Sequence, residues 1–245
     1  MTMVGLIPAR AGSQRIPGKN MRLFAGHPLL TYAIASAIQS AVFSAVYVSS
    51  DDAASLQLAE QMGVEPCPRL PEHATAVAPD IWWVTDLLSR RRERAEAFAI
   101  LRPTSPFRTA ATIQRGYQQF SAMADCGDSI RAIAPVKETP YKMWRYDGTH
   151  LPIRPLLEGL NADGVPWHSC PTQCCPVIYR QTATLEMAWT RVPERQETIA
   201  GRKIGGFLVN AWEAIDLNTL EDWEAAERLA AARPDLLPPI ATPCG

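Results

Sequence analysis

Residues 7–20 read IPARAGSQRIPGKN and follow directly on a short apolar run, Met3–Ile7, that ends at Pro8. An apolar run of this length bounded by a turn residue is typical of a buried strand. The stretch after it combines two glycines, which permit close backbone approach to a ligand, with the cations Arg10, Arg15 and Lys19. Because α/β folds bind phosphates in loops at the carboxyl ends of parallel strands, this stretch predicts a phosphate site. Its spacing matches neither the P-loop nor the dinucleotide fingerprint, and a solvated basic loop is the alternative.

Strand-like and helix-like segments alternate along the rest of the chain. Short apolar runs indicate further buried strands at Ala45–Val48, Phe98–Leu101, Ser129–Val136 and Ile204–Val209. Apolar positions three and four apart predict helices at Leu29–Gln39, Ala53–Met62, Pro79–Arg92, Thr109–Met123 and Thr219–Ala231. This alternation favours right-handed βαβ units, and we predict one Rossmann-like α/β domain over residues 1–245 with a mostly parallel sheet.

The alternation stops over residues 139–176, which contain Pro, Trp and Gly without a sustained period. Long irregular stretches inside compact domains are usually functional or disordered. The apolar side chains here, among them Trp144, Leu156 and Trp167, argue against disorder. We therefore expect an extended arm or a loop that covers a site.

Bulk composition restricts the class of ligand. The 245 residues are 47% hydrophobic and 20% charged, with a formal net charge of -1, which gives no general attraction to nucleic acid or anionic membranes. A small-molecule ligand is therefore expected. The longest apolar runs fall short of the roughly 20 residues that span a bilayer, and the chain enters its first strand almost at once, so we expect a cytoplasmic protein.

The six cysteines do not form the pattern of a small disulfide framework, and we expect reduced thiols: Cys67, Cys126, Cys170, Cys174, Cys175 and Cys244. His168 and the three nearest cysteines are numerous enough to bind zinc. Their spacing lacks the paired arrangement of zinc ribbons, so loop packing is the expectation and zinc the alternative.

The segment 7–20 closely resembles the opening signature of the acylneuraminate cytidylyltransferase family, which activates sialic and related nine-carbon acids. Four more segments resemble family landmarks in the correct order: Val48–Asp52, Arg69–Glu72, Leu101–Thr109 and Ile215–Asp222. The resemblance implies a Rossmann-like nucleotidyltransferase that transfers CMP from CTP to an acidic sugar and releases pyrophosphate. It also implies that residues 139–176 form a dimerisation arm and that the protein is a homodimer.

The resemblance assigns Arg10 and Lys19 to the triphosphate as catalytic cations. The rest of the implied nucleotide pocket comprises Pro8, Ala9, Gly12, Ser13, Arg15 and Asn20, with Arg69 and Ala78 near the base or ribose. Such a pocket suits the chemistry, because nucleotidyl transfer develops charge on phosphate oxygens that fixed cations and Mg²⁺ stabilise.

Asp216 is the best candidate ligand for Mg²⁺, which commonly uses one or two protein carboxylates. Where the family usually has a second Asp, this chain has Asn218, whose neutral amide can coordinate a metal but lowers the charge of the site. The alternative for Asp216 is a turn or helix-entry residue. Asp51 and Asp52 either contact the metal or cap the helix that follows Ser50, and capping is the expectation.

The acceptor half matches the family less well. The implied acceptor residues are Arg102, Thr104, Ser105, Arg108, Tyr179 and Arg180. Arg102 stands where the family often has Gln, and it either binds an acceptor carboxylate or pairs with a structural acid. Thr182 and Ala183 replace the usual Asn-Gly, so we expect a related nonulosonate or other acidic sugar as acceptor. The alternatives are a Kdo-type or other sugar nucleotidyltransferase of the same fold and a noncatalytic nucleotide-binding protein.

Overall fold

The computed structural model describes residues 1–91 and 94–240, apart from the side chain of Gln196. The chain forms two compact units. Unit 1 joins Met1–Ala132 to Thr182–Gly245, and unit 2 comprises Ile133–Gln181. The segment expected to form an arm, residues 139–176, lies inside unit 2.

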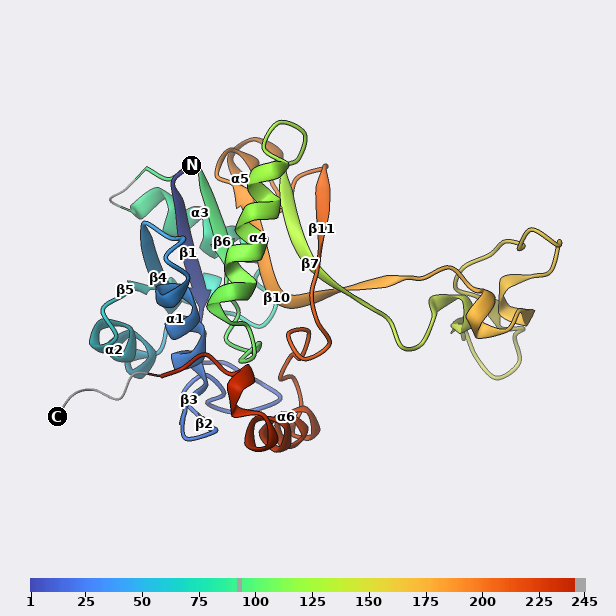
Figure 1. Cartoon of the computed structure of the whole chain (residues 1–245), viewed down its shortest axis with the longest axis horizontal. Coiled ribbons are helices and arrows are strands. Elements are labelled where there is room, and N and C mark those ends of the chain that lie inside the picture. Colours follow the sequence, from blue (N-terminus) through green and yellow to red (C-terminus); the bar gives the residue numbers. More distant parts are fainter. Residues whose placement is uncertain (92–93, 241–245) are drawn as a thin grey trace. The chain divides into compact units, whose positions relative to one another are not determined.

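A seven-stranded sheet in the order β11-β7-β10-β6-β1-β4-β5 forms the centre of the fold (Figure 1). Its strands are β1 (Met3–Pro8), β4 (Ala45–Ser50), β5 (Glu65–Pro68), β6 (Ala97–Ile100), β7 (Ser129–Pro135), β10 (Tyr179–Trp189) and β11 (Ile204–Leu208). Strand β1 pairs in parallel with β4 and β6, and β4 pairs in parallel with β5. Strand β10 is antiparallel to β6. The prediction of a mixed α/β fold with a mostly parallel sheet is confirmed.

Helices lie on both faces of this sheet. They are α1 (Leu29–Ser40), α2 (Ala53–Gln61), α3 (Asp80–Arg90), α4 (Ala110–Ala122), α5 (Arg191–Gln196) and α6 (Leu220–Ala232). Helix α3 packs Trp83 and Leu87 against one face, in a cluster that includes Ala188 of β10. Helix α4 brings Gly116 against Leu185, which points to the other face because successive strand residues alternate.

The predicted elements are present, with ends shifted by one or two residues where the structure describes them. The expected helix end at Arg92 lies outside the described residues, as does Cys244. The sequence analysis missed β10, the edge strand β5, the short helix α5 and the two-residue strands β2 (Leu23–Phe24) and β3 (His27–Pro28).

A second apolar cluster supports the loops at one end of the sheet. Phe24 meets Trp223 and Phe107 edge to face, with ring centroids 5.6 and 6.1 Å apart. Ile16 lies in the loop that follows β1, which we call the first loop. Ile16 and Leu217 are fully buried in the same cluster. Thr219 and Asp222 form a capping box at the start of α6, and Thr219 lies two residues after Leu217. The cluster therefore anchors both the first loop and the segment before α6.

Unit 2 contains little regular structure. Its elements are β8 (Trp144–Arg145), β9 (Arg154–Pro155) and the 3₁₀ turns η2 (Pro140–Lys142), η3 (Trp167–Ser169) and η4 (Thr172–Cys174). Lys142 donates from its ammonium to the carbonyls of His168 and Cys170. Among the described residues, the cysteines are free thiols, and no three His, Cys, Asp or Glu side chains come together in a group that could hold a metal.

The remaining short elements are η1 (Pro71–His73), between β5 and α3, and η5 (Pro234–Leu236), after α6. Every helix within residues 1–91 and 94–240 is too short or too polar to cross a bilayer.

Candidate active site

Four parallel strands end at the same edge of the sheet, and each is followed by a polar or charged residue. Strands β1, β4, β5 and β6 are succeeded by segments that carry Arg10, Asp51, Arg69 and Arg102. The carboxyl edge of a parallel sheet is where α/β folds bind their ligands. This edge is therefore the candidate active site.

The loop after β1 is held in one conformation by hydrogen bonds. The amide of Ala11 donates to Asp51 Oδ1 at 2.7 Å, and Asn20 Nδ2 donates to the carbonyl of Arg10 at 3.1 Å. The Arg10 guanidinium donates to the carbonyl of Thr75 at 3.1 Å. Gly18 has φ +62°, a left-handed conformation that favours glycine. These contacts fix the loop before any ligand arrives.

A pocket of about 180 Å³ opens beside this loop and is lined by Arg10, Ala11, Gly18, Asn20, Met21, Asp52, Ala54 and Ser55. Asp52 caps α2 by accepting from the Ser55 amide at 2.9 Å. The capping alternative therefore holds for Asp52, while Asp51 orders the first loop. Both carboxylates have structural partners.

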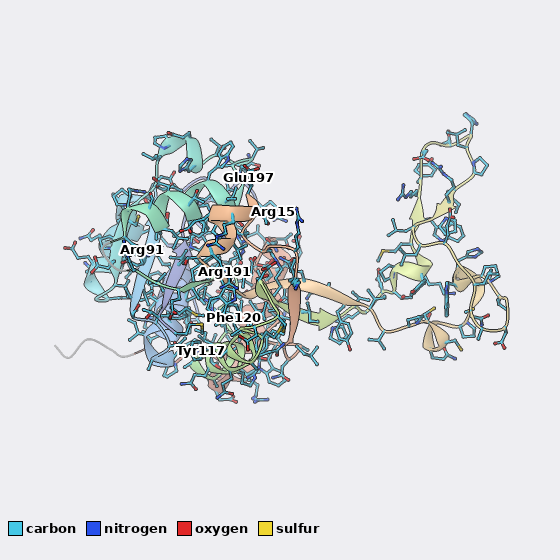
Figure 2. The ribbon with its side chains drawn as sticks, turned by 90° about the horizontal axis from the view of Figure 1, so that it is seen from above. Arg15, Arg91, Tyr117, Phe120, Arg191 and Glu197 are labelled. Atoms are coloured by element: carbon cyan, nitrogen blue, oxygen red, sulfur yellow. The ribbon has the colours of Figure 1, made fainter. Side chains whose placement is uncertain are left out.

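The segment before α6 lies directly against the first loop. Lys19 Nζ donates to the carbonyl of Leu217 at 2.8 Å, and the exposed Arg15 donates to Asn218 Oδ1 at 2.9 Å (Figure 2 labels Arg15). The Leu217 amide donates in turn to the carbonyl of Thr104 at 2.9 Å. Three segments far apart in the sequence thus meet at one place.

The charge distribution favours an anionic ligand near Lys19. Burial lowers the pKa of the Lys19 ammonium, and the neighbouring Arg15 and Arg10 guanidiniums lower it further, against the opposing effect of Asp216. A bound phosphate would counter the repulsion among these cations. Binding of a triphosphate would therefore reduce the electrostatic repulsion between Lys19 and the two arginines.

Asp216 has one carboxylate oxygen available to a ligand. Its Oδ2 accepts from Asn218 Nδ2 at 2.6 Å, whereas its Oδ1 is buried and has no hydrogen-bond partner among the described residues. A buried carboxylate oxygen without a partner is costly unless a cation or donor binds it. Oxygen ligands of this kind suit Mg²⁺, so the residues present fit that ion. The Asn218 side chain uses both of its amide atoms: Oδ1 accepts from Arg15, and Nδ2 donates to Asp216.

Arg69 is buried and has hydrogen-bond partners within the protein. It is 7% exposed, donates from Nε to Ser49 Oγ at 3.1 Å, and lies 4.7 Å from the centre of the Trp83 ring. Burial lowers its pKa to about 10, despite the favourable charges of Asp80 and Asp51. Ala78 lies two residues before α3 and is partly exposed.

Arg102 pairs with two structural acids. Its Nε and NH2 donate to Glu186 Oε1 at 3.2 and 2.9 Å, and NH2 also pairs with Asp80. Burial alone would lower the pKa of Arg102, but Glu186 and Asp80 outweigh that effect and raise it. Glu186 also pairs with Arg131. Of the two alternatives for Arg102, the structure therefore shows the structural pair and not a free carboxylate clamp.

Arg108 and Ser105 do not reach the surface. Arg108 is fully buried and donates to the carbonyls of Arg102 and Thr184 at 3.0 and 2.9 Å. Ser105 is 2% exposed. Ser105 Oγ and Arg108 Nε and NH2 are buried without a hydrogen-bond partner among the described residues, and Arg108 joins the loop after β6 to β10. That these two side chains contact the acceptor stays a prediction. Thr104, from the same loop, is partly exposed.

Tyr179 and Arg180 are exposed on the first residues of β10, which belong to unit 2. In the nucleotide half, Pro8 and Ala9 lead into the loop, and Gly12 and Ser13 lie at or near its surface.

The sequence analysis missed Asp80 and Glu186. The signal for Glu186 was a single acid within the otherwise uncharged stretch Leu185–Trp189.

The site geometry agrees with comparisons to known proteins. A family model described as cytidylyltransferase matches residues 4–107, which carry the first loop, Asp51 and Arg69. Over 235 residues, 94% of this chain and 96% of the relative, the sequence is 30% identical to CMP-N,N'-diacetyllegionaminic acid synthase of Legionella pneumophila. The chain belongs to the cytidylyltransferase family. Membership makes it a CTP-dependent nucleotidyltransferase.

Further relatives of this cytidylyltransferase match over about half of its length. N-acylneuraminate cytidylyltransferase of Escherichia coli is 37% identical over 45% of the chain and 26% of the relative. Pseudaminic acid cytidylyltransferase of Campylobacter jejuni is 30% identical over 47% of the chain and 51% of the relative. Among solved structures, CMP:2-keto-3-deoxy-manno-octonic acid synthetase complexed with CTP has a TM-score of 0.70 at 15% identity, covering 95% of this chain and all of that one. This last likeness concerns the fold.

We predict that Glu186→Ala destabilises the cytidylyltransferase by roughly 3–5 kcal/mol, because it leaves the Arg102 and Arg131 charges without their shared carboxylate. Urea denaturation followed by circular dichroism measures this change. The control is Asp86→Ala, which removes the partner of the 42% exposed Arg90 and should cost below about 1 kcal/mol. Equal losses in the two variants would contradict the role assigned to Glu186.

Proposed function

We propose that the protein transfers CMP from CTP to a nonulosonate acceptor in the cytoplasm, with release of pyrophosphate. A nonulosonate is proposed as the acceptor because the chain is similar, over nearly the whole of both chains, to a CMP-N,N'-diacetyllegionaminic acid synthase. The geometry supports the nucleotide half, since Arg10, Lys19 and Asp216 converge at the carboxyl edge of the sheet.

In the proposed reaction the acceptor hydroxyl oxygen attacks the α-phosphorus of CTP in line with the departing pyrophosphate. A bond forms between that oxygen and the α-phosphorus as the hydroxyl loses its proton to water, while the bond to the oxygen that bridges to the β-phosphorus breaks. Negative charge grows on the α-phosphate oxygens and on the leaving group. Arg10 and Lys19 are fixed in the first loop by backbone partners and offer positive charge without reorganisation, which is the source of the rate enhancement.

Loop and acceptor residues have distinct roles in this proposal. Arg15 and Asn20 order the triphosphate pocket, with Ser13 and Gly12 at its surface and Pro8 and Ala9 at its base. Thr104, Tyr179 and Arg180 are the proposed acceptor contacts, and Arg69 and Ala78 are proposed to lie near the base or ribose.

The function is tested by measuring pyrophosphate release from CTP with a panel of acidic sugars. The panel contains legionaminate, pseudaminate, N-acetylneuraminate and Kdo derivatives, each at the same concentration. We expect a nonulosonate to give the highest rate. Highest activity with Kdo would favour the Kdo-type alternative, and CTP binding without pyrophosphate release from any acceptor would favour the noncatalytic one.

We predict that Arg10→Ala and Lys19→Ala each lower turnover about ten- to a thousandfold, because each removes a cation from the transition state. Steady-state pyrophosphate release measures the change. Arg233→Ala removes an exposed cation paired with Asp235 and serves as the control. Wild-type turnover in both loop variants would remove these residues from the mechanism.

We further propose that Asp216 and Asn218 hold the Mg²⁺ of the reaction, a role supported by the unpartnered Asp216 Oδ1. A bound Mg²⁺ would supply positive charge to the phosphate oxygens. Asp216 provides the carboxylate, and Asn218 orients it through the hydrogen bond to Oδ2.

We predict that Asn218→Asp lowers the Mg²⁺ concentration needed for half-maximal turnover, because it adds a second carboxylate to the site. Asp216→Asn should raise that concentration or abolish activity. Both are read from turnover at increasing Mg²⁺, with Mg²⁺ binding to the CTP-free protein measured by calorimetry as a second readout. An unchanged Mg²⁺ requirement in both variants would place the metal elsewhere.

We also propose a homodimer formed through unit 2. Within its residues 133–181, unit 2 exposes many large apolar side chains: Met143, Trp144, Tyr146, Leu151, Ile153, Leu156, Leu157, Leu160, Val165, Val177 and Tyr179. Exposed apolar surface on this scale is typical of an interface. A second copy of the chain is the occupant that the family resemblance implies.

We predict a dimeric mass by light scattering at micromolar concentration. Ile153→Asp should shift the mass toward the monomer, because it introduces a charge into the apolar surface of unit 2. Leu23→Asp changes a side chain in unit 1 that is 62% exposed and should leave the mass unchanged. A monomeric mass for the wild-type protein would refute the dimer.

A further inference from the structure

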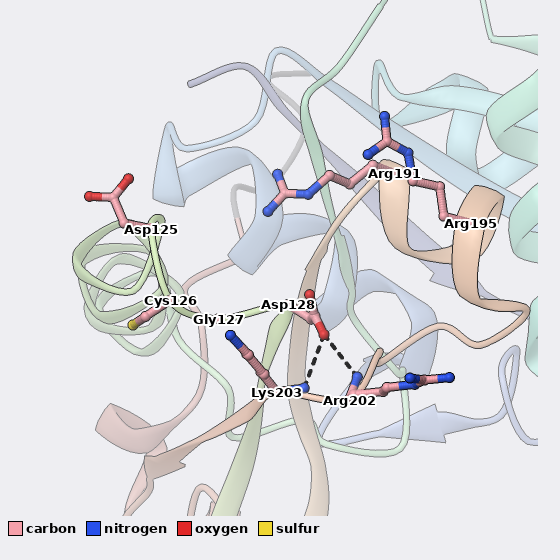
Figure 3. A pocket seen from close by; sticks show the side chains of 8 residues that line it. All are labelled: Asp125, Cys126, Gly127, Asp128, Arg191, Arg195, Arg202 and Lys203. Atoms are coloured by element: carbon pink, nitrogen blue, oxygen red, sulfur yellow. Dashed lines mark hydrogen bonds between the residues drawn. The ribbon is translucent and has the colours of Figure 1, made fainter.

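A second charged pocket lies at the opposite edge of the sheet from the candidate active site. Strand β10 ends at Trp189, which pairs with Ala97, the first residue of β6. The pocket has a volume of about 550 Å³ and is lined by Asp125, Cys126, Gly127, Asp128, Arg191, Arg195, Arg202 and Lys203 (Figure 3). We call it the basic pocket. It lies wholly within unit 1, at the amino edge of the parallel strands.

Four cations of the basic pocket come from two segments of the chain. Arg191 and Arg195 belong to α5, and Arg202 and Lys203 precede β11. Within the part of the chain that the structure describes, none of these four side chains forms a salt bridge, and all four are exposed. Their charges are therefore available to an anion.

The acidic residues of the pocket do not cancel these charges. Asp128 Oδ2 accepts from the backbone amides of Arg202 and Lys203 at 2.8 and 3.0 Å, so its carboxylate orders the backbone of the loop (dashed lines in Figure 3). Asp125 is exposed, and Figure 3 shows its carboxylate directed away from the cations. Four cations against two carboxylates, one of them used by the backbone, leave the pocket positive.

The framework beneath the cations is closely packed. The Arg191 guanidinium lies 4.8 Å from the centre of the Trp189 ring, and Trp189 Nε1 donates to the carbonyl of Gly127 at 3.1 Å. Stacking on an aromatic ring orients a guanidinium without neutralising it. Arg191 is labelled in Figure 2 as well as in Figure 3.

The loop that carries Arg202 and Lys203 is equally constrained. Gly201 has φ +73°, and a Cβ there would lie 2.5 Å from Asp128 Cβ, so only glycine permits this close approach. Ser129 Oγ donates to the carbonyl of Ala200 on the same loop. The backbone positions of the cationic residues are thus set by packing, whereas a merely solvated surface would require no such arrangement.

We propose that the basic pocket binds a small molecule that carries two or more phosphate groups. Its volume falls in the range of small-molecule sites and exceeds the size of a single phosphate. The described residues that line the pocket offer cations and include no aromatic side chain, and the nearby Trp189 is 8% exposed and covered by Arg191. Recognition therefore depends on charge, and the phosphate groups are the part of the ligand that is bound.

Isothermal titration calorimetry with inorganic tripolyphosphate, in the absence of Mg²⁺, tests this proposal on the full chain. Binding to the basic pocket should persist in Lys19→Ala protein, which lacks a cation of the other edge. It should weaken at least about tenfold in Arg195→Ala/Lys203→Ala protein, because charge-assisted contacts to phosphate are lost. Orthophosphate should bind the pocket at least about tenfold more weakly than tripolyphosphate, since it reaches fewer cations.

The matched control is Arg228→Ala/Arg233→Ala, which removes two exposed cations from the end of α6. Thermal melting of each variant confirms that it is folded. The proposal is overturned if the pocket variant binds tripolyphosphate as tightly as the control does, or if Lys19→Ala alone abolishes all binding. Because the readout is binding and not turnover, failure here leaves the proposed transferase function untouched.

Discussion

The hydrogen bond from Lys19 Nζ to the Leu217 carbonyl joins the first loop of the protein to the segment that carries Asp216. The two segments are separated by nearly the whole chain. The only other side-chain hydrogen bond between them that the described residues show is the one from the exposed Arg15 to Asn218. The Lys19 bond also holds a partly buried ammonium close to Arg10 and Arg15, whose charges oppose it. The structure tolerates that repulsion because the loop is fixed by Asp51, Asn20 and the apolar cluster around Phe24. A triphosphate is the ligand that this arrangement suits.

Much of the fold could be predicted from the sequence. Apolar runs such as Met3–Ile7 and helical periodicity such as Leu29–Gln39 depend on local patterns, and the apolar runs predicted the parallel strands β1, β4 and β6 but not the edge strand β5. The antiparallel strand β10 escaped prediction because its buried residues include Thr182, Thr184 and Glu186, which interrupt any continuous apolar run. Its place between β6 and β7 depends on long-range pairing that no local pattern specifies.

The acceptor half was harder to predict for a related reason. A sequence shows that Arg102 is charged but not which acids lie beside it, and Asp80 and Glu186 are distant along the chain. The same limit applies to Arg108, whose complete burial no local pattern indicates. Both arginines connect the loop after β6 to β10, through Glu186 and the Thr184 carbonyl.

Hydrogen–deuterium exchange with and without CTP and Mg²⁺ tests most directly whether the first loop grips the triphosphate. The account predicts that CTP slows exchange over residues 9–20 and over residues 215–219, because phosphate contacts and the Lys19–Leu217 link order both segments together. Slower exchange elsewhere in the chain, with residues 9–20 unchanged while CTP is bound, would contradict it.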